Sequence, residues 1–180
     1  MYKIINTNLE GCVEILPDMF EDKRGTIIKP YHHPSFKELG INENFDEDLF
    51  VKSKKGVIRG LHFQRDPFGQ SKLIYCISGS ILDVAVDIRK DSKTYGEYVC
   101  FNLNAEKMNM AYIPNGFAHG YEVLEENTAV IYKLSSKYSP ESEGGIKWDS
   151  MDICWNEKNP IISDKDKELP TFFEYTTNFR

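Results

Sequence analysis

The stretch Leu73-Ile74-Tyr75-Cys76-Ile77-Ser78-Gly79-Ser80-Ile81-Leu82-Asp83-Val84-Ala85-Val86-Asp87-Ile88 contains two apolar, β-branched runs around a glycine turn. Two such runs joined by a short turn predict a β-hairpin. Side chains alternate between the two faces of a strand, so Leu82, Val84, Val86 and Ile88 share one face of the second run. This is the predicted core face. The opposite face, which carries Ile81, Asp83, Ala85 and Asp87, is expected to be exposed to solvent or to line a polar cavity.

Similar strand signals continue along the chain. Further strands are predicted over residues 98–103, 110–113, 120–124 and 129–134, with turn residues between them. Many short strands at roughly ten-residue spacing predict a mostly-β sandwich or barrel. Helical pattern is limited to residues 34–39 and a turn around 163–167. Because no repeat or linker interrupts the pattern, residues 1–180 are predicted to form one domain.

The composition is that of an ordinary globular protein. The 180 residues are 41% hydrophobic and 28% charged, and the net charge of −6 gives no reason to expect a nucleic-acid partner. No apolar run long enough to span a membrane and no export signal is present, so a cytoplasmic location without membrane contact is expected. The four cysteines, Cys12, Cys76, Cys100 and Cys154, are widely spaced and are predicted to be reduced.

Two of the four histidines lie in motifs at the ends of predicted strands. The first is Arg59-Gly60-Leu61-His62-Phe63-Gln64, followed by Lys72, and the second is Ile113-Pro114-Asn115-Gly116-Phe117-Ala118-His119-Gly120. Histidine titrates near neutral pH, and a nearby lysine or arginine can hold an oxyanion. The two motifs therefore predict a site for acid–base chemistry.

Paired histidine motifs in a mostly-β chain also suggest a metal-binding cupin. The second motif fits a cupin, but a metal-binding first motif needs His-x-His and then an acid, whereas this chain has His62-Phe63-Gln64 and then Lys72. A lysine ammonium is not a ligand and repels a cation. The sequence therefore predicts no metal.

Proton transfer at carbon fits these residues better. His62 can remove a proton from a carbon next to a carbonyl group, and Lys72 can stabilise the enolate that forms. Alternation over residues 129–134 allows Tyr132 to point inward and return a proton from the opposite side. Together these roles describe an epimerase.

The same residues carry a family resemblance. The chain resembles dTDP-4-dehydrorhamnose 3,5-epimerases in Asp22-x-Arg24-Gly25, in both histidine motifs, and in Lys72-Leu73 and residues 83–89. The resemblance continues in Tyr132-Lys133, Tyr138-Ser139-Pro140-x-x-Glu143-Gly144 and residues 162–166. It implies a dimeric β jelly-roll of the cupin type that acts on a nucleotide-linked 4-keto-6-deoxy sugar without a cofactor.

Site residues follow from the resemblance position by position. His62 would be the base, Asp166 its partner, Lys72 the group that stabilises the enolate, and Tyr132 the opposing acid. The substrate-binding positions are Arg24, Lys29, Glu47, Asp48, Leu49, Arg59, Gln64, His119, Glu143 and Lys165.

Three of these positions, Lys29, Glu47 and Leu49, depart from the family pattern, whereas Asp48 matches it. Lys29 replaces a glutamate, and Glu47-Asp48-Leu49 replaces Gln-Asp-Asn. These changes leave open whether one or both sugar centres are inverted. A keto-sugar isomerase and a non-catalytic sugar-nucleotide-binding module are the other open alternatives.

Several residues have simpler interpretations. Tyr138 is expected to serve in packing, and Asp83 and Asp87 to be solvated or paired with Arg89. His32 and His33 are expected at the surface, and the N-terminal residues 1–15 can supply a strand exchanged in a dimer.

Overall fold

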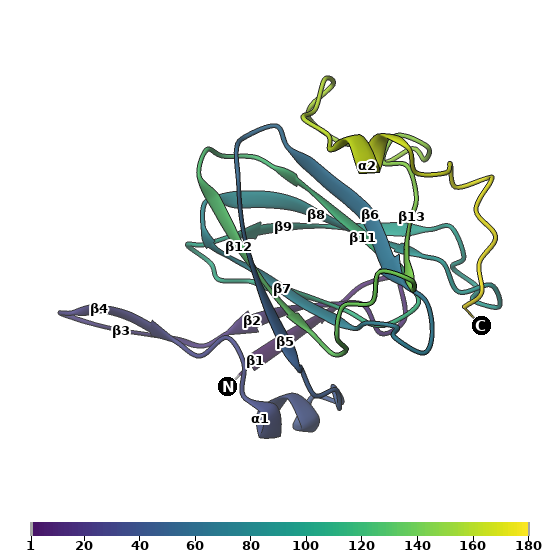
Figure 1. Ribbon diagram of the computed structural model, residues 1–180. Helices are drawn as coiled ribbons and strands as arrows, with labels where there is room; N and C mark the ends of the chain where they lie inside the picture. Colours follow the sequence, from purple (N-terminus) through teal and green to yellow (C-terminus); the bar gives the residue numbers. More distant parts are fainter. Residues whose placement is uncertain (1, 180) are drawn as a thin grey trace.

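The computed structural model describes residues 2–179, and two antiparallel sheets form its body (Figure 1). The six-stranded sheet has the order β1 (Tyr2–Asn6), β2 (Val13–Pro17), β10 (Met110–Ile113), β7 (Lys72–Ser78), β12 (Thr128–Leu134) and β5 (Glu47–Ser53). The five-stranded sheet has the order β13 (Glu143–Gly145), β6 (Ile58–Gln64), β11 (Phe117–Val123), β8 (Ser80–Asp87) and β9 (Tyr98–Asn104). This confirms the predicted mostly-β sandwich.

The remaining elements are small. A hairpin of β3 (Met19–Asp22) and β4 (Gly25–Ile28) projects away from the sheets (Figure 1). The helices are α1 (His33–Glu38) and α2 (Asp164–Lys167), and both lie where the sequence predicted helical structure. No helix in the described part of the chain is long and apolar enough to cross a membrane.

The hairpin predicted over residues 73–88 is wrong. Strand β7 pairs with β10 and β12, whereas β8 pairs with β11 and β9, so the two strands lie in different sheets. Gly79 allows the crossing because its φ is +70°, and a side chain there would collide with Thr128. A glycine turn between two buried strands therefore fits a change of sheet as well as a hairpin.

Both faces of β8 are buried, so of the two expected surroundings of its acidic face, water or a polar interior, the structure has the interior. Ile81 and Ala85 pack in the core between the sheets with Ile74 of β7 and Val130 of β12. The acids on that face therefore point into the interior and not to water. The opposite face packs against the C-terminal segment.

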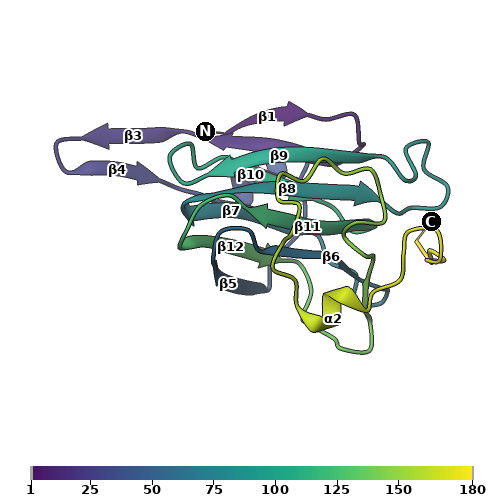
Figure 2. The ribbon, with the colours of Figure 1, turned by 90° about the horizontal axis from the view of Figure 1, so that it is seen from above.

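Irregular segments cover the outer faces of both sheets. Residues after β13 run over the five-stranded sheet, where Trp155, Phe172 and Phe179 pack against Val84 and Val86 (Figure 2). Phe36 of α1 packs on the outside of the six-stranded sheet. The interior between the sheets is filled mainly by strand residues, with Leu9 and Cys12 from the β1–β2 connection, and at one end it opens into a pocket.

The candidate active site

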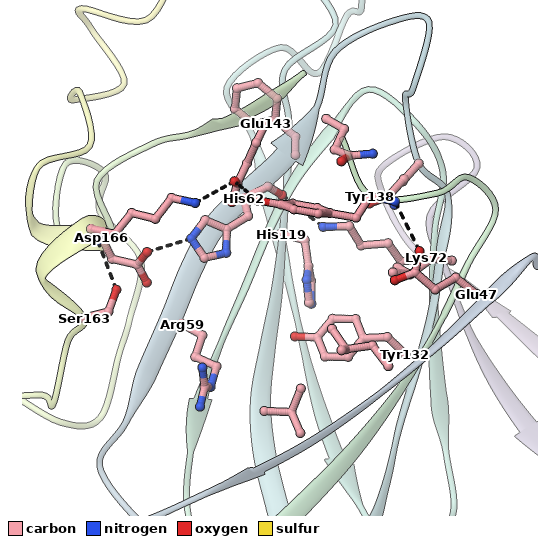
Figure 3. A pocket seen from close by; sticks show the side chains of 17 residues that line it. Glu47, Arg59, His62, Lys72, His119, Tyr132, Tyr138, Glu143, Ser163 and Asp166 are labelled. Carbon is pink, nitrogen blue, oxygen red and sulfur yellow. Dashed lines mark hydrogen bonds and ion pairs between the residues drawn. The ribbon is translucent and has the colours of Figure 1, made fainter. Parts of the chain in front are cut away.

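A pocket of about 510 Å³ opens between the two sheets. Side chains from β5, β12 and β7 form one wall, and side chains from β6, β11, β13 and α2 form the other. His62, Lys72, His119 and Tyr132 point into this space from four different strands (Figure 3). The pocket thus gathers the residues that the two histidine motifs and the following strands supplied.

On β6, a local irregularity aims two residues at the pocket. Arg59 and His62 are three positions apart, a spacing that regular alternation would place on opposite faces. The pairing of β6 with β11 shifts register between His119 and Tyr121, and a Cβ atom on Gly60 would lie 2.6 Å from the carbonyl oxygen of His119. The glycine allows this close approach, and both side chains line the pocket as a result.

The first charged pair in the pocket is His62 with Asp166. The Nε2 atom of His62 lies 2.8 Å from Oδ1 of Asp166, and the His62 side chain remains 34% exposed. The second carboxylate oxygen accepts a hydrogen bond from the backbone N–H of Gly60. Burial would raise the pKa of Asp166, but these hydrogen bonds hold it below its ordinary value. An ionised Asp166 that accepts the Nε2 proton leaves Nδ1 of His62 with its lone pair free.

A capped helical turn positions Asp166. The hydroxyl group of Ser163 accepts a hydrogen bond from the backbone N–H of Asp166, which starts α2 beside β6. Asp166 itself is buried, although it lies in a short surface helix. The cap therefore holds the carboxylate of Asp166 against His62, although the two residues are 104 positions apart in the sequence.

A second histidine–aspartate pair lies deeper. The Nε2 atom of His119 lies 2.7 Å from Oδ2 of Asp83, and both side chains are almost completely buried. Burial lowers the pKa of His119 more than the adjacent Asp83 raises it. His119 is consequently neutral at pH 7 and donates its Nε2 proton to the carboxylate.

Lys72 and Tyr132 stand on the wall opposite β6. The ammonium group of Lys72 donates a hydrogen bond to the carbonyl oxygen of His62, at 3.1 Å. Burial lowers the pKa of Lys72 to about 8. For Tyr132, burial and the nearby Tyr121 and Asp83 raise the pKa well above its ordinary value. The pocket thus holds a cation on one strand and a protonated phenol on the neighbouring strand.

The edge strand β5 sends alternate residues into the pocket. Glu47, Leu49 and Val51 line it, and Leu49 is directly opposite Tyr132 in the β5–β12 pairing. Asp48 lies between two lining residues on the other face of β5, where its carboxylate bonds to Lys133 at 2.7 Å. Asp48, expected among the substrate-binding residues, is therefore turned away from this pocket by strand alternation.

At the mouth of the pocket, Glu143 joins two other side chains. Its Oε2 atom accepts hydrogen bonds from Lys165 at 2.6 Å and from the hydroxyl group of Tyr138 at 2.7 Å. Tyr138 is 53% exposed and lines the pocket, which corrects the expectation that it serves only in packing. The backbone N–H of Tyr138 also donates to Glu47, so this loop is tied to β5.

Gln64 lines the same pocket but is bonded to backbone. Its amide nitrogen donates to the carbonyl oxygens of Phe68 and Lys137, and its oxygen accepts from the N–H of Ser139. The side chain is buried. These contacts hold the loop that carries Tyr138, which is a different use from the direct substrate contact expected.

Arg24 and Lys29 lie outside the pocket. Arg24 is at the turn of the projecting hairpin and pairs with Asp22. Lys29 follows the hairpin and lines a different hollow with Tyr2 and His32. Neither is brought to His62 within this chain, so their expected substrate contacts are not made in the pocket of the same chain.

The described residues also bear on metals and disulfides. Between residues 2 and 179, no group of three or more His, Cys, Asp or Glu side chains is arranged to hold a metal ion. All four cysteines are free, as predicted.

Comparisons with known proteins identify relatives over nearly the whole chain. The family model for dTDP-4-dehydrorhamnose 3,5-epimerase matches residues 6–174. An enzyme of that name from Shigella flexneri is 42% identical over 166 residues, which cover 91% of this chain and 92% of the relative.

Solved structures agree with this match. A dTDP-4-dehydrorhamnose 3,5-epimerase from Bacillus anthracis, with TDP and PPi bound, has a TM-score of 0.93 at 38% identity and covers 95% of this chain and 99% of its own. The Legionella pneumophila dTDP-6-deoxy-D-glucose-3,5-epimerase in complex with dTDP-4-keto-L-rhamnose has a TM-score of 0.94 at 36% identity, covering 98% and 95%. These neighbours confirm the predicted cupin-type fold class.

Proposed function

Because this chain belongs to the dTDP-4-dehydrorhamnose 3,5-epimerase family, we propose that its pocket inverts C3 and C5 of a dTDP-linked 4-keto-6-deoxy sugar. The observation that carries this proposal is the His62–Asp166 pair on one wall of the pocket, with Lys72 and Tyr132 on the other. The enzyme is an isomerase, since no atom is gained or lost overall.

His62 is the general base. The 4-keto group acidifies the protons on the two adjacent carbons, and Nδ1 of His62 can accept one of them because Nε2 is engaged with Asp166. The ionised Asp166 then stabilises the imidazolium that forms. Partial exposure of His62 leaves room for a sugar ring beside it.

Lys72 holds the negative charge that moves onto the ketone oxygen. Its ammonium group has three protons, and one of them donates to the carbonyl oxygen of His62. The remaining protons can bind the enolate oxygen in a site from which most water is excluded. Neutral His119, directly opposite His62 in the β6–β11 pairing, lies where it can contact the same sugar.

Tyr132 is the acid that returns a proton to the other face of the sugar. Its raised pKa keeps the phenol protonated at neutral pH, and it lies on the wall opposite β6. Proton removal on one side and return on the other inverts the carbon. Repetition at the second carbon gives the double epimerisation.

The rest of the substrate is bound toward the mouth of the pocket. Arg59 can bind a phosphate oxygen, because its side chain lines the pocket. Its guanidinium group donates a hydrogen bond to the hydroxyl group of Ser53, which is neutral and leaves the positive charge of Arg59 for a ligand. Glu143 and Lys165 offer an acceptor and a donor at the mouth. The exposed ring of Tyr138 offers a flat surface for the nucleotide base.

The proposal includes a homodimer. The hairpin exposes large apolar side chains, Met19, Phe20 and Ile27, and carries Arg24 far from the pocket of its own chain (Figure 1). Exposed apolar patches of this kind are typical of protein interfaces. In a dimer, Arg24 and Lys29 can reach the pocket of the second copy. Light scattering should give twice the chain mass, and a monomer would exclude this part of the proposal.

A cytoplasmic location is also proposed. All four cysteines are unpaired in the described residues, which suits a reducing compartment. Fractionation of cells that express the protein should recover it with cytoplasmic markers, and recovery with the membrane or in an oxidising compartment would contradict this.

The first test is proton NMR of the metal-stripped protein with dTDP-4-keto-6-deoxyglucose in D₂O. We expect deuterium at both C3 and C5 of the sugar. Exchange at one carbon alone would indicate a single-centre epimerase, and no exchange at either carbon would overturn the proposal. A Tyr132→Phe variant narrows the test, because it should keep solvent exchange better than completed inversion.

A further inference from the structure

Asp83 is a buried carboxylate with an incomplete set of partners. It lies on β8, directly opposite Tyr121 in the β8–β11 pairing, and is fully buried in the interior between the sheets. Its Oδ2 atom accepts a hydrogen bond from the Nε2–H group of His119, and its Oδ1 atom has no hydrogen-bond partner within residues 2–179. A buried carboxylate is costly unless other groups compensate its charge.

The other buried carboxylates of the described chain are compensated by direct contacts. Asp87 forms an ion pair with Arg89 at 2.8 Å, and Asp166 pairs with His62. Glu122 accepts hydrogen bonds from the backbone N–H groups of Asn156 and Glu157. Within the described chain, the side chain of Asp83 has one hydrogen bond, that with His119, which is neutral at pH 7 and supplies no positive charge. Its compensating charge must therefore come from a group that it does not touch.

Lys72 is a buried cation that lines the pocket on the wall opposite the five-stranded sheet, to which Asp83 belongs. Lys72 is 7% exposed. Its ammonium group donates a hydrogen bond to the neutral carbonyl oxygen of His62 and is not in an ion pair with a carboxylate among the described residues. Lys72 and His119 both line the pocket, and His119 contacts Asp83, which lies with it in the sheet opposite that of Lys72. We propose that Asp83 is a positioning residue that acts as the buried counter-ion of Lys72 and keeps its side chain an ammonium at neutral pH.

Electrostatics around Lys72 agree with this pairing. Burial lowers the pKa of Lys72, and the two carboxylates that oppose this effect are Asp83, the stronger, and Glu143. The other charged or titratable groups that line the pocket are Glu47, Arg59, His62, His119, Tyr132, Tyr138, Lys165 and Asp166. Glu143 is paired with Lys165 at the mouth of the pocket, and of the two carboxylates Asp83 has the larger effect on the pKa of Lys72.

The direction of the expected effect follows from the sign of the charge. Removal of a nearby negative charge makes the ammonium less favourable and lowers the pKa of Lys72 from about 8 toward or below neutrality. A neutral amine at pH 7 cannot stabilise an enolate. The catalytic consequence rests on the proposed function, but the charge state of Lys72 does not, and it can be measured without substrate.

The test is a titration of Lys72 in an Asp83→Asn variant of the full chain. Asparagine has nearly the same shape, keeps one acceptor oxygen for the Nε2–H of His119, and replaces the charged oxygen by a neutral NH2 group. Carbon-13 NMR of labelled lysine side chains, with the Lys72 signal assigned by its loss in Lys72→Met, gives the titration directly. We expect the midpoint to move to lower pH by at least about one pH unit, and the alkaline limb of kcat to move with it.

A matched control is Asp87→Asn. Asp87 is on the same strand and the same face, and it is also fully buried, but its charge is taken by Arg89. This variant should lose stability without moving the Lys72 titration. An unchanged Lys72 midpoint in Asp83→Asn, or an equal shift in Asp87→Asn, would overturn the proposal.

A double-mutant cycle covers the case in which Asp83→Asn is too unstable for the titration. In a Lys72→Met background, Asp83→Asn should cost less free energy of unfolding than in the unmodified chain, because no unpaired buried charge is then left behind. An equal or larger cost in the Lys72→Met background would overturn the counter-ion role. If the titrations behave as expected but no solvent exchange occurs at the sugar, the proposed function fails and the counter-ion role stands.

Discussion

The pocket contains two histidine–aspartate pairs with nearly the same contact distance and different surroundings. In one, His62 lies 2.8 Å from Asp166 and is 34% exposed, and in the other, His119 lies 2.7 Å from Asp83 and is 2% exposed. The histidines are directly opposite each other in the β6–β11 pairing. Solvent access separates their roles: the first ring can exchange protons with a ligand, whereas the second is held neutral by burial.

The largest difference between the pairs should appear on replacement of His62. General acid–base catalysis contributes roughly 10²–10⁴-fold, so His62→Ala should lower kcat by about that factor. Its free energy of unfolding should fall by about 1 kcal/mol at most, because water can enter the pocket and solvate Asp166. Steady-state kinetics and urea unfolding measure the two effects. Most activity retained in a folded His62→Ala protein would contradict the role of base.

His119→Ala should instead affect the stability of the protein more than His62→Ala does. Removal of this ring leaves the carboxylate of Asp83 buried with no hydrogen-bond partner, at an expected cost of about 3 kcal/mol in the free energy of unfolding. Urea unfolding of the His119→Ala and His62→Ala proteins under the same conditions compares their free energies of unfolding. Equal destabilisation of the two variants would show that burial does not distinguish the pairs.

Asp166→Asn tests the exposed pair from its carboxylate side. The variant should lower kcat by about tenfold to a hundredfold, because the amide cannot stabilise the imidazolium as a carboxylate does. It should also change the pH dependence of stability. The pKa of Asp166 is depressed in the folded state, so its contribution to stability is present above the ordinary carboxyl pKa and is lost as pH falls.

The free energies of unfolding of Asp166→Asn and the unmodified protein should therefore differ at pH 7 and converge below about pH 4. Unfolding in urea at a series of pH values measures this. A difference that persists unchanged into acid would mean that the charge of Asp166 contributes nothing to stability.

Much of this arrangement was predictable from sequence, and the failures have physical causes. The histidine motifs, Lys72 and Tyr132 could be recognised because the strands that carry them have clear signals. Asp83 was expected to be solvated or paired, because alternation cannot identify the outward face of a strand that is buried on both sides. Asp48 and Leu49 are adjacent in sequence, and only the pairing of β5 with β12 shows which of them lines the pocket.

The change of sheet at Gly79 was missed for a similar reason. A short glycine turn between two apolar runs is equally compatible with pairing of the two strands and with separation into two sheets. The same uncertainty hid the position of Asp83, since a hairpin would have placed β8 beside β7 and not across the interior from it. The contact between Asp166 and His62 joins positions 104 residues apart, so local pattern cannot reveal it, and it was expected only from the family resemblance.

The smallest expected effect concerns Leu49, which touches neither pair but lies opposite Tyr132 on the pocket wall. With Val51 it presents only hydrocarbon to the ligand, so this part of the wall cannot hydrogen-bond a sugar hydroxyl group. Leu49→Asn restores the family-typical residue and should change kcat/KM by up to about tenfold, as expected for a single wall contact. Because Leu49 adjoins the acid and not the base, the ratio of inversion to solvent exchange at C3 and C5 should change more than the exchange rate itself. NMR in D₂O measures both quantities. A change in exchange alone would instead connect Leu49 with the His62 side of the pocket.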